Sequence, residues 1–66
     1  MSDRGYQALA FELEAKAIEI EVKGMEAENL QRQHTGASLA YGVEHFDDAA
    51  VRLRELAEKI RALVFV

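Results

Sequence analysis

The second half of the chain carries one regular stripe of apolar residues. The stripe advances in steps of four and three, and its members are Leu39, Val43, Phe46, Ala50, Leu53, Ala57, Ile60 and Val64. Because an α-helix has about 3.6 residues per turn, this spacing places all of these side chains on one helical face. The pattern predicts a single amphipathic helix in this half.

The first half has a more ambiguous pattern, because residues 11–17 and 18–23 both alternate between apolar and polar in the manner of strands. The alternation changes phase between Ala17 and Ile18 without a turn residue, which would turn one strand's apolar side chains toward solvent. On a helix the conflict disappears, because the apolar residues form two stripes. We name them the Leu13 stripe (Tyr6, Ala10, Leu13, Ala17, Ile20, Gly24, Ala27) and the Ile18 stripe (Ala8, Phe11, Ala15, Ile18, Val22, Met25).

Charge spacing also favours helices. An acidic residue precedes a basic one by four positions in five pairs: Glu12 with Lys16, Glu19 with Lys23, Glu28 with Arg32, Asp48 with Arg52, and Glu55 with Lys59. Such a pair adds about 0.2–0.5 kcal/mol to a helix, whereas the same residues do not meet on a strand.

The segment between the two helical patterns has turn chemistry. Gly36 can adopt the left-handed conformation that ends a helix, and Ser38 can cap the next one. A start near Gly42 stays open as an alternative, although Leu39 is already in phase with the following stripe. We therefore predict one all-α domain over residues 1–66, an antiparallel two-helix hairpin with helices at about 3–33 and 38–64 and a turn at about 34–38.

Two apolar stripes on the first helix are one more than a hairpin needs. The small residues Ala10, Ala17 and Gly24 would allow a close helix approach, which favours packing the Leu13 stripe inside the hairpin. The Ile18 stripe would then be uncovered, and uncovered apolar strips mark interfaces. With the apolar C-terminus added, the expected interface between chains comprises Ala8, Phe11, Ala15, Ile18, Val22, Met25 and Phe65.

The small size of the chain also predicts association. A domain of 66 residues gains about 3–5 kcal/mol at most from a single core, and the absence of cysteine excludes disulfides and thiolate zinc sites as further support. We expect a homo-oligomer, with a dimer forming a four-helix bundle favoured, or else docking on a larger helical protein.

Charge and hydropathy narrow the range of partners and locations. The formal net charge of −4 has the wrong sign for a surface that neutralises phosphates, so we expect no nucleic-acid partner. No apolar run approaches the roughly 18 residues of a membrane span. Residues 1–5 lack the basic-then-apolar pattern of a signal peptide, which leads us to expect a cytoplasmic location.

Candidate chemistry is sparse. His45 has Glu44 and Asp48 within helical reach, but these supply too few ligands for a metal site from one chain. Ser2, Thr35 and Ser38 are better explained as capping residues than as nucleophiles, and a thin hairpin offers no pocket for a desolvated carboxylate. We expect no enzyme activity, catalytic residue, cofactor or metal.

Two classes of function follow from these observations. The first is a small non-catalytic interaction or assembly protein, either self-associating or acting as an accessory subunit of a larger protein. The second is a ligand- or metal-binding helical bundle whose site forms in the core of the oligomer. A bundle architecture by itself does not select an activity.

Overall fold

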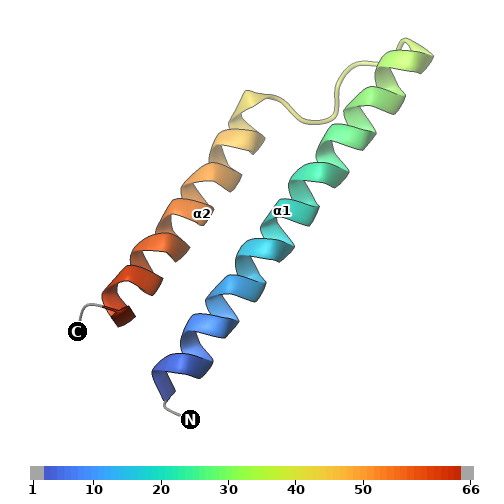
Figure 1. Cartoon of the computed structure of the whole chain (residues 1–66). Coiled ribbons are helices and arrows are strands. Elements are labelled where there is room, and N and C mark those ends of the chain that lie inside the picture. The colour runs from blue at the N-terminus through green and yellow to red at the C-terminus, as the bar shows by residue number, and fades with distance from the viewer. Residues whose placement is uncertain (1–2, 65–66) are drawn as a thin grey trace.

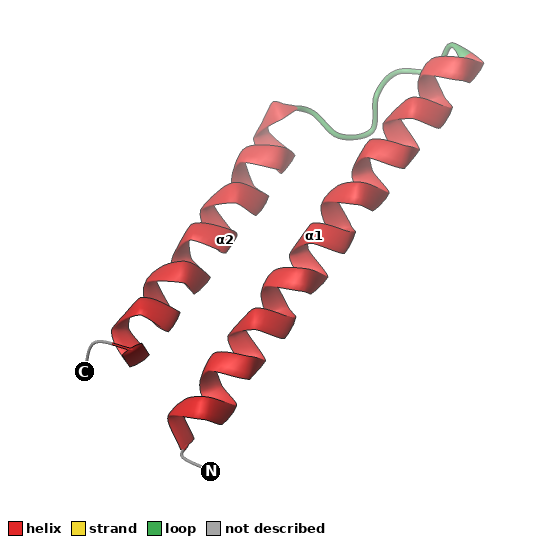
Figure 2. Cartoon of the chain, viewed as in Figure 1, coloured by secondary structure: helices red, strands yellow, loops and turns green. Residues whose placement is uncertain are grey.

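The computed structural model describes residues 3–64 as two long helices joined by a loop (Figure 1). Helix α1 comprises Asp3–Thr35 and α2 comprises Val43–Val64, and the two run antiparallel. All of the regular structure in this range is helical (Figure 2). The chain measures 51 × 20 × 9 Å along its principal axes, so it is a single layer of two helices. The predicted all-α hairpin is confirmed.

Helix α1 ends at a glycine-based cap. Gly36 has a φ of 76°, in the left-handed region that glycine tolerates without a side-chain clash. Its N–H donates to the Gln33 carbonyl at 3.2 Å, and the Ala37 N–H donates to the Arg32 carbonyl at 2.9 Å. This pair of bonds is the Schellman motif, which satisfies carbonyls that the helix end leaves without partners. The predicted conformation and role of Gly36 are confirmed.

Helix α2 begins at Val43, so the predicted start at Ser38 is wrong and the alternative near Gly42 is correct. The cap is built by His45, whose N–H donates to the Gly42 carbonyl at 3.1 Å and whose Nδ1 accepts the Gly42 N–H at 3.2 Å. This reciprocal arrangement resembles a capping box with histidine as the returning side chain. Ser38 lies in the loop, where its carbonyl accepts a 3.4 Å bond from Arg32 Nη1.

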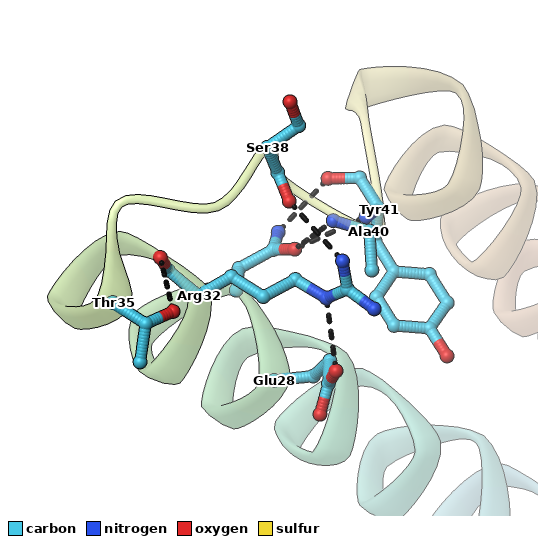
Figure 3. Close-up of polar contacts among 7 residues, drawn as sticks. Glu28, Arg32, Thr35, Ser38, Ala40 and Tyr41 are labelled. Atoms are coloured by element: carbon cyan, nitrogen blue, oxygen red, sulfur yellow. Dashed lines mark hydrogen bonds and ion pairs between the residues drawn. The ribbon is translucent and has the colours of Figure 1, made fainter.

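The late start of α2 has a cause on α1. The Oδ1 atom of Asn29 accepts the backbone N–H groups of Ala40 (3.1 Å) and Tyr41 (3.0 Å), and its Nδ2 donates to the Tyr41 carbonyl at 2.8 Å. The loop therefore bonds to α1 instead of forming another helical turn. Figure 3 shows this region, with Arg32 also bonded to Glu28 and to the Ser38 carbonyl.

The core of the hairpin is very small. Only Ile18 (4% exposed), Ala49 (3%) and Leu56 (6%) are buried among the described residues. The partly buried apolar residues packed against them are Phe11, Ala15, Val22 and Leu53. The Ile18 stripe therefore faces α2, and the prediction that it would be the uncovered face is wrong.

The physical reason lies in the sizes of the packed side chains. Ile18 and Phe11 bury more apolar area against α2 than alanine or glycine could, and buried apolar area is the main favourable term in packing. The small residue in the core is Ala49, which belongs to α2. The small residue that α1 contributes next to this core is Ala15, not Ala10, Ala17 or Gly24 as we had expected.

The ion pairs differ in part from those predicted. Among the five predicted pairs, Glu28–Arg32 is the one that closes within residues 3–64, with Nε and Oε1 2.9 Å apart. Arg52 instead contacts Glu21 of the opposite helix, with Nη1 and Oε2 3.0 Å apart. The Lys59 ammonium lies 5.8 Å from the centre of the Phe11 ring. Arg52 and Lys59, which the sequence pairs with acidic residues of their own helix, therefore contact α1 instead.

Candidate interaction surface

The face of α1 that points away from α2 is rich in exposed apolar side chains. The large ones are Tyr6 (58% exposed), Leu9 (51%), Leu13 (58%), Ile20 (69%) and Leu30 (56%). Between them lie four small residues that are also exposed, Ala10, Ala17, Gly24 and Ala27. We call these nine residues the outer strip. It contains the whole Leu13 stripe, which we had placed inside the hairpin.

The small residues of the outer strip do not serve the hairpin. A Cβ added at Gly24 would meet no atom within 4 Å, and Ala10 and Ala17 are exposed. Two series of strip residues each recur every seven positions and alternate along the helix. One series is Ala10, Ala17 and Gly24, and the other is Tyr6, Leu13, Ile20 and Ala27. This is the heptad spacing with which one helix packs along another in a coiled coil. The outer strip therefore has the form of a helix-packing seam.

The two flanks of the outer strip carry charges of opposite sign. One flank is acidic, because a glutamate follows each of three small residues of the strip by four positions. These glutamates are Glu14, Glu21 and Glu28. The other flank is basic, because a lysine directly precedes two of these small residues. These lysines are Lys16, before Ala17, and Lys23, before Gly24. In heptad geometry these are the two positions that border an apolar seam.

The interface residues predicted from the sequence lie elsewhere. Ile18 is in the core, and Phe11, Ala15 and Val22 pack against it. Ala8 and Met25 are partly buried on the same face. Phe65 lies outside the described residues. The predicted docking face is therefore the contact surface of the hairpin itself, and sequence reasoning found both stripes but exchanged their roles.

The two histidines have exposed positions near the loop. His45 caps α2, its Nδ1 lies 3.6 Å from Glu44 Oε1, and its ring meets the Tyr41 ring edge-on with centroids 5.4 Å apart. His34 lies in the last turn of α1, where a cation is favoured by the helix dipole. Among the described residues, no three histidine, aspartate or glutamate side chains are grouped so that they could hold a metal ion.

One hollow of the surface lies beside the acidic flank. It has a volume of about 540 Å³ and is open to solvent. It is lined by Glu21, Gly24, Met25, Glu28, Arg32, Ala40 and Tyr41. None of the described polar or charged side chains is buried, so the polar groups in this hollow are hydrated. The hollow lies between the acidic flank of α1 and the loop residues Ala40 and Tyr41, and Gly24 is the residue that it shares with the outer strip.

The total surface of the chain is large for its mass. The hairpin exposes 5160 Å². Compact monomeric proteins follow a scaling of surface with mass that gives about 4200 Å² for a chain of 7.4 kDa. The hairpin thus exposes roughly 950 Å² more than a compact monomer of the same mass would.

Comparison of the chain with protein-family models, with curated proteins and with solved structures finds no match. Neither described helix has the length and apolar character that crossing a membrane requires.

Proposed function

We propose that this chain is a small non-catalytic assembly protein that works by packing further helices against α1, in the simplest case those of its own copies. The observation that carries the proposal is the outer strip, with five large apolar side chains that are all more than half exposed. Contiguous apolar surface of this kind is rare on monomers and marks interaction sites.

The energetics of the hairpin support the same proposal. Full burial of one large apolar side chain stabilises a protein by about 1.5–3 kcal/mol, while the total stability of a domain is typically only about 5–15 kcal/mol. Only three described residues of the hairpin are buried, so its core gives little stability. Covering the outer strip would add a contribution comparable with that of the core. Association and stability are therefore coupled in this proposal.

The test is the oligomeric state and its link to stability. We expect sedimentation to give a mass above the 7.4 kDa of one chain. We also expect the melting temperature to rise over about a hundredfold increase in protein concentration, because a ligand or subunit that binds only the folded state stabilises it by mass action. A monomer whose melting temperature is independent of dilution would contradict the proposal. Stoichiometric metal in native mass spectra would instead favour a metal-binding bundle.

A further inference from the structure

We infer that the outer strip binds the outer strip of a second copy of this chain, with the two α1 helices parallel. The inference rests on the proposed function, since it specifies which face associates, what covers it and in which direction. It is carried by two independent observations, the charges that flank the strip and the area that the hairpin leaves exposed.

The flanking charges decide the direction. In a parallel pair of helices, a residue that directly precedes Ala10, Ala17 or Gly24 lies beside the partner residue five positions further along the chain. Lys16 of one copy then lies beside Glu21 of the other, and Lys23 lies beside Glu28. Twofold symmetry doubles these contacts. An antiparallel pair would instead place lysine beside lysine and glutamate beside glutamate, which is unfavourable.

The same charges favour a second copy over an unrelated helix. A surface with one acidic and one basic flank is complementary to itself when two copies align in parallel, so no other sequence is needed to satisfy it. Glu21 and Glu28 each already pair with an arginine of their own chain, Arg52 and Arg32 respectively. A carboxylate has two acceptor oxygens and can accept from a lysine as well.

Burial of an interface in a dimer would bring the exposed surface of each chain close to that of a compact monomer. The excess surface of the hairpin, roughly 950 Å² per chain, is close to the roughly 800 Å² that each partner buries in a stable interface of standard size. Gly24 has open space at its Cβ position, so a helix can approach α1 closely there. Because α2 covers the opposite face, the two α1 helices would form the centre of the dimer with each α2 on the outside.

Disulfide trapping tests whether the two α1 helices pair in parallel. The native chain has no cysteine, so a single introduced thiol reports one position. Parallel pairing brings residue 10 of both copies together within the narrow Cα separation that a disulfide requires, whereas antiparallel pairing places these residues at opposite ends. We expect Ala10→Cys to form a disulfide dimer on mild oxidation. Glu12→Cys, in the same turn of α1 but outside the strip, is the matched control and should cross-link much less.

A mixture of two cysteine variants would reveal antiparallel pairing if it occurs. When Ala10→Cys and Ala27→Cys proteins are mixed, parallel pairing gives disulfides between positions 10 and 10 and between 27 and 27. Predominant linkage between positions 10 and 27 would show antiparallel pairing and overturn the inference. Association without any preference of Ala10→Cys over Glu12→Cys would overturn it as well, because the strip would then not be the interface.

Charge and strip variants test the same interface without cross-linking. The double variant Lys16→Glu/Lys23→Glu makes both flanks acidic, and we expect its dimer dissociation constant to rise about tenfold or more. Ile20→Glu should abolish the dimer and lower the melting temperature, because association and stability are coupled, while circular dichroism at low temperature still shows helices. If wild type associates and Ile20→Glu associates equally well, the inference fails while the proposed assembly function stands. If wild type is a monomer, the assembly function itself fails.

Discussion

Helix α1 has two apolar faces that look alike in sequence and differ in structure. Ile18 and Ile20 are the same residue type and lie two positions apart in the same helix, yet Ile18 is 4% exposed and Ile20 is 69% exposed. Each belongs to a stripe with regular helical spacing. The difference shows that periodicity identifies the faces of a helix, whereas the position of the neighbouring helix decides which face becomes the core.

The two faces also differ in how their residues are combined. The inner face presents bulky side chains such as Phe11 and Ile18 to a cluster that includes Ala49 of α2. The outer face alternates small with large residues and is bordered by charges of opposite sign. The first combination fits a partner of different sequence, which is α2. The second fits a copy of itself, as proposed above.

The largest expected effect is on the inner face. Ile18→Ala should lower the free energy of unfolding by about 2–5 kcal/mol at every protein concentration, because it leaves a cavity in a core of three buried residues. Ile20→Ala is the matched control. Chemical denaturation of both variants at several concentrations would measure the difference. If Ile20→Ala lowers the free energy of unfolding of a monomeric sample as much as Ile18→Ala does, the two faces do not differ as described.

A polar residue extends the inner face toward the loop. Asn29→Ala removes three hydrogen bonds to the backbone of Ala40 and Tyr41, each with a net contribution of about 0.5–1.5 kcal/mol. We expect a loss of about 2 kcal/mol, with faster hydrogen exchange at the Ala40 and Tyr41 amides. Gln33→Ala, an exposed substitution nearby on α1, should have little effect. Unchanged protection of the two amides in Asn29→Ala would show that the loop does not depend on this anchor.

The smallest expected effect is a gain in stability from a substitution on the outer face. Gly24→Ala should stabilise the hairpin by about 0.5–1 kcal/mol, because the helix interior favours alanine and no atom obstructs the new Cβ. The measurement belongs in the Ile20→Glu background, where pairing of the strips is removed. As a contrast, Gly36→Ala should cost about 1–2 kcal/mol, since its φ of 76° is unfavourable for residues with a side chain. A loss in Gly24→Ala in that background would mean that the outer face is packed within one chain.

Local signals in the sequence predicted much of the fold. The helical spacing of both halves and the left-handed glycine at position 36 depend on neighbouring residues, so they predicted two helices, the hairpin and the end of α1. The start of α2 was not predictable in the same way. It depends on hydrogen bonds from Asn29 to residues 40 and 41, and the sequence around Asn29 carries no signal for that long-range contact.

For the candidate interaction surface, the sequence alone determined that α1 has two apolar stripes, because amphipathic periodicity is a property of the helix itself. Which stripe is covered was decided only by the tertiary structure. The total area that two helices bury depends on how side chains from both interdigitate, as Ile18 does with Ala49 and Leu56 in one cluster. No pattern within α1 contains that information, since half of the contact belongs to α2.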